Sequence, residues 1–243
     1  ACLRLPGQTV HFHTPVGREE IEETLERATK SSFYAAEESL RSGYFTAEGG
    51  LRLGLGGSLL LRKGEPVGFR TVSSISIRIP HAVSCVTDEL LRRLEGKSVL
   101  IYSPPGGGKT TFLRDLVRRI SDGGQRVSLV DERGELAALW EGVPQFDVGR
   151  NTDVIEGCPK LHAAEMLLRT MSPQVLAVDE LSSGEMPLLS SGLAAGGQLL
   201  ATAHAADLGE LCRRGVGSGR FSLAVGIGRS GGERRYRVEE LPC

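Results

Sequence analysis

Residues 98–120 read SVLIYSPPGGGKTTFLRDLVRRI, in which a turn rich in glycine and proline joins an apolar run to an amphipathic run. The run 98–102 predicts a buried strand, and the run 112–120 predicts a helix with one apolar face. Such a turn aims successive backbone N–H groups inward, and the first N–H groups of the helix have no partner within it. Together with the positive end of the helix dipole, these groups favour phosphate oxygens. The stretch therefore predicts a nucleotide-binding loop.

The loop matches the phosphate-binding pattern G-x-x-x-x-G-K-[ST] with one departure, because Ser103 stands at the first glycine position. Lys109 is expected to reach the β- and γ-phosphates, and the Thr110 hydroxyl is expected to ligate Mg²⁺. An ordinary surface turn is the alternative, but the flanking strand and helix favour ATP binding. The predicted nucleotide-binding residues are Ser103, Pro104, Pro105, Gly106, Gly107, Gly108, Lys109, Thr110 and Thr111.

A second nucleotide signature follows, in the apolar run Gln174–Glu180, which ends in two acids. Asp179, at the tip of the predicted strand, is expected to hold Mg²⁺, and Glu180 is expected to polarise the attacking water. The next apolar run, Gln198–His204, predicts another strand whose end faces the same crevice. His204 is then a contact for the γ-phosphate or the catalytic water, with a structural loop histidine as the alternative.

Acids also follow the predicted strand Arg126–Val130. The carboxyl ends of parallel strands form the edge where α/β sheets bind ligands. Either Glu135 or Glu132 is expected to position a water near the γ-phosphate as part of the catalytic set. Acids that merely decorate a helix N-terminus are the alternative, and the pattern does not choose between the two.

The composition indicates a globular protein with a packed core and argues against some classes of partner. Of the 243 residues, 40% are hydrophobic and 24% are charged, and the formal net charge is −1. Near-zero net charge and an aromatic content of only 5% count against nucleic-acid binding. No apolar run approaches the roughly 20 residues of a membrane span. The five cysteines form no C-x-x-C pair, which favours reduced thiols in a cytosolic protein over a zinc site.

The pattern of elements changes near residue 80 and predicts two domains. Residues 1–80 are expected to form a small α+β domain, and residues 81–243 an α/β domain in which helices alternate with apolar strands. Thr14-Pro15 predicts the start of the first helix. The other predicted helices are 32–41, 88–94 and 161–170. The other predicted strands are 44–46, 51–53, 58–61 and 74–79, with a hairpin formed by 221–227 and 234–239.

Two groups of arginines are candidates for contacts to the nucleotide. Those of the N-terminal part either belong to solvated strand faces or reach the phosphates of a nucleotide held by the other domain or a neighbouring subunit. Those of the C-terminal part are candidates for completing a neighbour's site. The first group is Arg52, Arg70 and Arg78, and the second is Arg133, Arg150 and Arg169.

A series of segments together resembles the stage III sporulation protein AA family, a relative in endospore-forming bacteria of the type II and type IV secretion ATPases. The resemblance runs from about Thr14 to about Leu208, and Asp153–Lys160 and 171–174 are more specific to the family than the phosphate loop. The segments that carry it, in chain order, are 69–70, 73–79, 103–115, 130–135, 153–160, 169–174, 178–180 and 201–204.

The resemblance implies a RecA-like P-loop NTPase core with a smaller N-terminal α+β domain, assembled as a homo-oligomer, a hexameric ring. It implies a nucleotide between the two domains, an acidic box at Asp131–Glu135 and a histidine box at Thr202–His204. The implied task is to energise a channel between mother cell and forespore, from the mother-cell cytoplasm, through membrane proteins of the channel complex. Ser103 and the serine-rich, proline-containing segment 181–187 depart from the family pattern.

The sequence thus predicts an ATPase that uses ATP and Mg²⁺, with Lys109, Glu135, Glu180 and His204 as catalytic residues. Two alternatives remain. One is a nucleotide-gated scaffold with little turnover, which measured turnover near zero would favour. The other is a RecA-like ATPase associated with nucleic acid, which stimulation by single-stranded DNA or RNA would favour.

Overall fold

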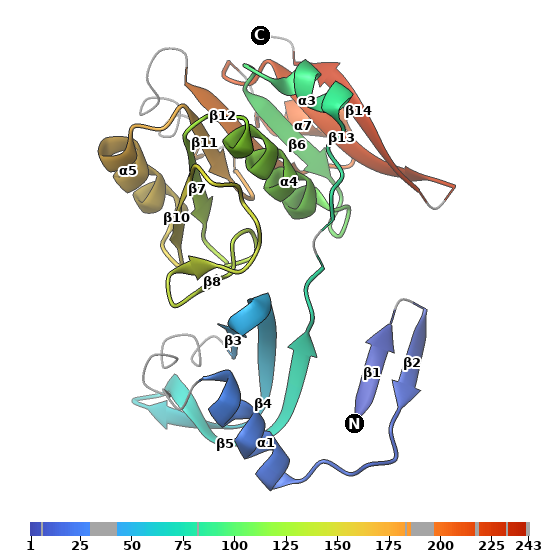
Figure 1. Ribbon diagram of the computed structural model, residues 1–243, viewed down its shortest axis with the longest axis vertical. Helices are drawn as coiled ribbons and strands as arrows, with labels where there is room; N and C mark the ends of the chain where they lie inside the picture. The colour runs from blue at the N-terminus through green and yellow to red at the C-terminus, as the bar shows by residue number, and fades with distance from the viewer. Residues whose placement is uncertain are drawn as a thin grey trace. The chain divides into compact units, whose positions relative to one another are not determined.

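The computed structural model describes residues 1–5, 7–29, 43–81, 83–182, 184–185, 197–216, 219–231 and 233–241. The chain divides into two compact units, Ala1–Pro80 and His81–Cys243 (Figure 1). The helix predicted over residues 32–41 lies outside the described residues. Within them, no helix combines the length and the apolar character that crossing a membrane requires.

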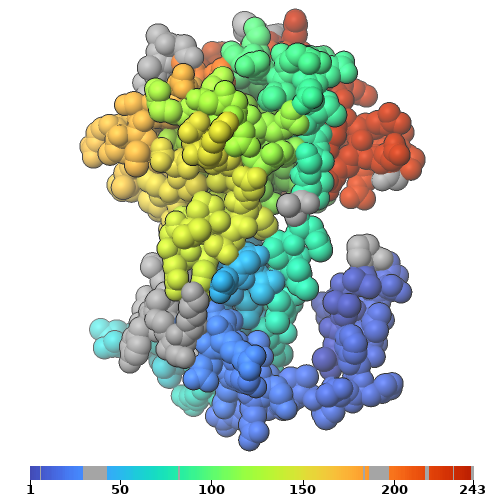
Figure 2. Space-filling model, viewed as in Figure 1, coloured from blue at the N-terminus to red at the C-terminus, as the bar shows by residue number. Residues whose placement is uncertain are grey.

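The second unit is built on a sheet whose order, in the described part of the chain, is β10-β7-β11-β12-β6-β13-β14. Neighbouring strands run parallel except β13 and β14, which pair antiparallel as an edge hairpin. The red strands of this hairpin lie at the surface of the unit in Figure 2. The strands are β6 (Val99–Ser103), β7 (Val127–Asp131), β10 (Thr152–Glu156), β11 (Val175–Val178), β12 (Gln198–His204), β13 (Leu223–Ser230) and β14 (Glu233–Glu240).

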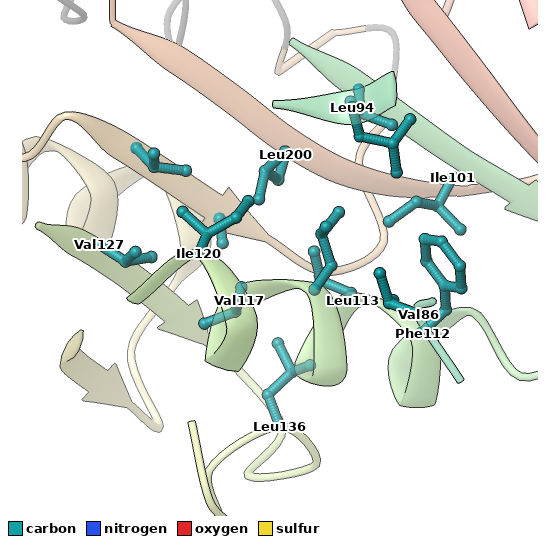
Figure 3. Packing of buried hydrophobic residues seen from close by; sticks show 14 of the residues in the cluster. Val86, Leu94, Ile101, Phe112, Leu113, Val117, Ile120, Val127, Leu136 and Leu200 are labelled. Atoms are coloured by element: carbon teal, nitrogen blue, oxygen red, sulfur yellow. The ribbon is translucent and has the colours of Figure 1, made fainter. Parts of the chain in front are cut away.

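Helices cover both faces of this sheet, which is why its central strands are apolar along their whole length. Helices α3 (Asp88–Leu94) and α4 (Lys109–Asp122) pack on one face, and α5 (Lys160–Met171) and α7 (Leu208–Arg213) pack on the other. Figure 3 shows the first of these cores, in which Phe112, Leu113, Val117 and Ile120 of α4 lie among Ile101, Val127 and Leu200 of the strands.

The strand order brings distant segments of the chain to one edge of the sheet. The register of β12 and β6 places His204 beside Ser103, at the start of the phosphate loop. The register of β10 and β7 places Glu156 beside Asp131. Strand β10 and the small hairpin of β8 (Leu139–Trp140) and β9 (Val143–Pro144) were not predicted from the sequence. The carboxyl ends of β6, β7, β11 and β12 therefore gather the residues of the predicted site.

The first unit contains an antiparallel sheet of β3 (Tyr44–Ala47), β4 (Leu51–Arg62) and β5 (Glu65–Arg78). Helix α1 (Arg18–Ala28) contributes Ile21 and Leu25 to a small core with Phe45, Ala47 and Leu53. The short 3-10 helix η1 (Glu48–Gly50) links β3 to β4. A separate hairpin joins β1 (Cys2–Leu5) and β2 (Gln8–His11).

Two predictions for the first unit were wrong. Residues 51–53 and 58–61 belong to one strand, β4, because its glycines allow close pairing rather than ending it. A Cβ on Gly57 would lie 2.0 Å from the Thr71 carbonyl oxygen, so any residue with a side chain would clash there. Helix α1 begins at Arg18 and not at Thr14-Pro15, because its start is set by Gly17, whose N–H donates to Glu20 Oε2 at 2.8 Å.

Candidate functional site

The phosphate loop has a backbone that depends on its glycines. Gly106 and Gly108 have φ values of 73° and 102°, in the left-handed region, and Gly108 is the N-cap of α4. A Cβ on Gly107 would lie 2.2 Å from Ser103 Oγ. Ser103 is buried, and its hydroxyl donates to the Pro104 carbonyl at 2.9 Å, so the serine at the first glycine position fits within the loop. The first N–H groups of α4 are left for an anion, as a phosphate cradle requires.

Lys109 connects the loop to the end of β12. Its buried Nζ donates to the Ser103 carbonyl at 3.1 Å and lies 2.9 Å from His204 Nδ1. An ammonium group only donates hydrogen bonds, so Nδ1 is the acceptor and the ring proton lies on Nε2, which donates to Glu180 Oε1 at 3.1 Å. Burial lowers the pKa of the Lys109 ammonium, and the charges of Asp179 and Glu180 oppose that shift. A chain of contacts therefore runs from Lys109 through His204 to Glu180.

The tip of β11 meets the start of α4 at Asp179. Thr110 Oγ1 donates to Asp179 Oδ2 at 3.0 Å, and the hydroxyl of buried Thr202 donates to the other carboxylate oxygen. The two nucleotide signatures, far apart in the sequence, thus share one point in space. A threonine hydroxyl beside a carboxylate supplies the hard oxygen ligands that Mg²⁺ prefers, so these two residues fit such an ion.

Glu180 follows β11 in an unusual backbone conformation. Its φ is 53°, a left-handed value that costs a non-glycine residue of order 1–3 kcal/mol. The conformation is held from both sides, because its N–H donates to Thr202 Oγ1 at 2.9 Å and its carbonyl accepts from Lys160 Nζ at 2.6 Å. Its carboxylate contacts His204 and, at 2.8 Å, Arg133 Nη2. The strain therefore aims the carboxylate at a fixed place between two donors.

A hollow of about 200 Å³ lies beside this carboxylate. Buried Lys160, the first residue of α5, forms ion pairs there with Glu185 at 3.5 Å and Glu132 at 3.8 Å. Acidic residues outnumber basic ones in its lining, and the buried Lys160 ammonium links acids from different segments. Its lining residues are Asp131, Glu132, Arg133, Lys160, Asp179, Glu180, Ser182 and Glu185.

The acids after β7 are used differently from one another. Asp131 is buried, and its carboxylate accepts the N–H groups of Glu135, Leu136 and Ala137 at 2.8–2.9 Å. The segment after Asp131 is a turn and not a helix, so the alternative of a helix N-terminus decorated with acids is wrong. Glu132 lines the hollow, whereas Glu135, whose carbonyl accepts from Arg114 at 2.5 Å, is not one of its lining residues.

Glu156, at the end of β10, was not singled out from the sequence. Burial raises its pKa to about 7, opposed by the Leu139 N–H that donates to it at 2.7 Å, and the neighbouring charge of Asp131 adds to the rise. Burial also raises the pKa of Asp131, against the backbone N–H groups that it accepts. The two residues lie side by side at the ends of β7 and β10, and we call them the Asp131–Glu156 pair, with Asp131 buried and Glu156 half-buried.

The predicted arginines lie in varied places. Arg133 pairs with Glu180, and Arg150 donates to the Asp122 carbonyl at 2.8 Å. Arg52 stacks on the Tyr44 ring at 3.8 Å. Arg52 is half-buried, whereas the other five arginines of the two groups are exposed, namely Arg70, Arg78, Arg133, Arg150 and Arg169.

Comparisons with known proteins show the family and the fold. The profile of the family described as "Sporulation stage III, protein AA" matches residues 6–222. "Stage III sporulation protein AA" of Bacillus subtilis (strain 168) is 36% identical over 217 residues, covering 86% of this chain and 71% of the relative.

Two solved structures are similar over nearly the whole chain, each at 16% identity. The pilus retraction motor PilT with bound ADP has a TM-score of 0.68, with 99% of this chain and 75% of that chain covered. The Legionella pneumophila ATPase DotB has a TM-score of 0.59, with 97% and 72% covered. The predicted fold class, a RecA-like core with a smaller N-terminal domain, is confirmed.

Proposed function

The chain belongs to the sporulation stage III protein AA family, and from that premise we propose that it is an ATPase that hydrolyses ATP to ADP and phosphate. The observation that carries the proposal is the meeting of two distant signatures, with Thr110 Oγ1 and Asp179 Oδ2 only 3.0 Å apart. Neither segment alone distinguishes a nucleotide site from an ordinary turn or strand end. Their junction supports one site that grips a triphosphate and directs a water.

The loop binds the phosphates through its backbone N–H groups and the Lys109 ammonium. Thr110 and Asp179 would hold a Mg²⁺ ion, which when bound neutralises charge that develops on the phosphate oxygens. The Glu180 carboxylate orients the attacking water and takes its proton, in the place that its strained backbone fixes. These roles divide binding and hydrolysis between different side chains.

Lys109 and His204 link the phosphates to that carboxylate. Lys109 Nζ now donates to His204 Nδ1. When the ammonium turns to the β- and γ-phosphates, His204 Nδ1 is released while Nε2 still donates to Glu180. His204 thereby reports at Glu180 whether the lysine is engaged with a nucleotide. This link supports a sensor role for His204 in the catalytic set.

The larger assembly is part of the proposal and is suggested by the family. Loss of the γ-phosphate releases the contacts of Lys109 and His204, and the N-terminal unit then moves relative to the core. In a hexameric ring, the movement passes to membrane proteins of the channel between mother cell and forespore. The protein then works from the mother-cell cytoplasm, peripheral to the membrane. The similarity to the motor PilT and the ATPase DotB supports the fold of the core and not the partners.

The test compares two substitutions with an exposed control, Lys97→Ala. Lys109→Ala is expected to weaken ATP binding by about tenfold to a hundredfold, because a charge-assisted contact to phosphate is lost. Glu180→Gln is expected to keep ATP binding and to lower turnover by about a hundredfold or more, because the proton acceptor is lost. Phosphate release and titration calorimetry measure both quantities. Normal turnover in Glu180→Gln would reject the role of Glu180.

One observation favours a second candidate function, a nucleotide-gated scaffold with little turnover. Arg133 Nη2 lies 2.8 Å from Glu180 Oε2, so this ion pair occupies a carboxylate oxygen that the attacking water would need. The two functions separate in the variant Arg133→Ala. An ATPase gains or keeps turnover when the pair is removed, whereas a scaffold binds ATP and stays near zero.

A further inference from the structure

The edge strand β14 carries an arginine that the sequence analysis did not single out. Side chains of β14 alternate, so that Arg234 and Tyr236 are half-buried while Arg235 is exposed. The buried side faces α4, because the Tyr236 ring lies 5.1 Å from the Phe112 ring. Arg234 is therefore directed at the helix that follows the phosphate loop.

Arg234 reaches the loop itself. An ideal Cβ on Gly108 would lie 3.1 Å from both Cζ and Nη2 of Arg234 and 3.2 Å from Nε. The whole guanidinium thus lies against the glycine that caps α4 and precedes Lys109. The hairpin of β13 and β14 places a second cation at the cradle, from the same chain.

The arginine is oriented by its neighbours on the same face. Arg234 and Cys85 both lie close enough to the Tyr236 hydroxyl to influence its pKa beside the larger effect of burial, since the thiol raises that pKa and the guanidinium lowers it. Burial raises the pKa of Tyr236 to about 12, so its hydroxyl stays protonated and can accept from the guanidinium. The guanidinium keeps further N–H groups for another acceptor, because it has five donors in all.

This placement is electrostatically unfavourable by itself. The N-terminus of a helix carries partial positive charge, which repels cations, and Lys109 already stands there. In the described part of the chain, Arg234 forms no ion pair with a carboxylate that would compensate its charge. A cation kept at such a place is stabilised when an anion with several oxygens binds between it and the loop.

Resting on the proposed function, we infer that Arg234 binds the nucleotide phosphates from the hairpin side of the loop. The strand order puts β14 on the far side of β6 from β12, which ends in His204, and from β11, which Asp179 follows. Arg234 therefore contacts the α- or β-phosphate, which ATP and ADP share, rather than the γ-phosphate that is removed. It is a binding residue and not part of the hydrolytic set.

The test measures the dissociation constants of ATPγS and of ADP, each with Mg²⁺, by titration calorimetry on the full chain. The variants are Arg234→Ala and Arg234→Lys, with Arg235→Ala from the exposed face of the same strand as control. Arg234→Ala is expected to weaken both nucleotides equally, by roughly tenfold to a hundredfold. Arg234→Lys is expected to lie between, because it keeps the charge and loses the fork. At saturating ATP, turnover stays unchanged and KM rises.

A second measurement separates binding from a structural role. Without nucleotide, the melting temperature of Arg234→Ala is expected to equal or exceed that of the wild type, since a repelled cation is gone. A lower melting temperature with unaltered nucleotide affinity would overturn the inference, as would a loss confined to ATPγS. Wild-type protein that binds neither nucleotide would overturn the proposed function and the inference together, whereas equal affinities in wild type and Arg234→Ala would overturn the inference alone.

Discussion

The acids at the ends of two neighbouring strands, β11 and β7, have opposite surroundings. Asp179 and Glu180, after β11, are held mainly by side chains, namely hydroxyls, the His204 ring and Arg133. Asp131, the last residue of β7, is held by three backbone N–H groups of the turn that follows it. Side-chain donors can rotate to other partners, whereas a turn cannot release its N–H groups without unfolding.

This difference distinguishes a site suited to catalysis from a site suited to a structural role. Both sites fit the same sequence pattern, an apolar strand that ends in acids. The exchangeable partners of Asp179 and Glu180 suit residues that must take up a metal ion and a water. The fixed partners of Asp131 suit a residue that shapes the chain next to the site. The sequence pattern thus indicates that the acids lie at the edge of the sheet, and the hydrogen-bond partners of each carboxylate indicate its role.

The largest effects are expected from removing one carboxylate at each of the two sites by the same substitution. Asp179→Ala is expected to lower turnover by at least about a hundredfold, because a carboxylate that would hold Mg²⁺ is lost. The free energy of unfolding is expected to change little. Asp131→Ala is expected to lower the free energy of unfolding by about 2–4 kcal/mol, because it leaves buried N–H groups without an acceptor. Turnover at saturating ATP and urea unfolding measure the two quantities.

The comparison fails if the two variants behave alike. A loss of stability in Asp179→Ala as large as that in Asp131→Ala would make both carboxylates structural. A folded Asp131→Ala with turnover reduced as far as in Asp179→Ala would place Asp131 in the catalytic set instead. Exposed Asp88 of α3, which pairs with Arg119, offers an Asp→Ala control on the same unit.

The elements of the site that lie within one continuous segment could be predicted from the sequence. The strand, loop and helix around Lys109 and the acids after β11 follow from patterns of neighbouring residues. The sites of Lys160 and Arg234 could not be predicted, because their partners are distant in sequence and no local pattern names them. Strand β4 was divided in two for a related reason. Glycines usually weaken a strand, and only the approach of Thr71 requires one at Gly57.

A smaller effect is expected from Lys160, which supports Glu180 without touching the phosphates. Lys160→Met is expected to lower turnover about tenfold at saturating ATP while ATP affinity stays unchanged. The reason is that the ammonium holds the Glu180 carbonyl in its left-handed conformation, which costs of order 1–3 kcal/mol. Exposed Lys97→Met is the matched control. Turnover per folded molecule equal to that of the wild type would limit Lys160 to stability.

The smallest effect concerns the Asp131–Glu156 pair and the pH dependence of stability. The pKa of Glu156 is raised from 4.5 to about 7 in the folded protein, so the folded state holds a proton that the unfolded state has released. The linkage therefore stabilises the folded protein below about pH 4.5, and this contribution is lost as the pH rises to about 7.

Glu156→Gln keeps an acceptor for the Leu139 N–H and removes the titration. It is expected to flatten the decline in the free energy of unfolding between pH 5 and pH 8 by about 1 kcal/mol, a value reduced because water screens a carboxyl that is only partly buried. Urea unfolding at several pH values measures the slope. If the free energy of unfolding declines as steeply in the variant as in the wild type, the Glu156 carboxyl is ionised over the whole range and does not contribute to the pH dependence. A flatter decline would sharpen the contrast with Asp179 and Glu180. The Asp131–Glu156 pair would then hold a proton that stabilises the fold, whereas Glu180, after the neighbouring strand, takes a proton from the attacking water.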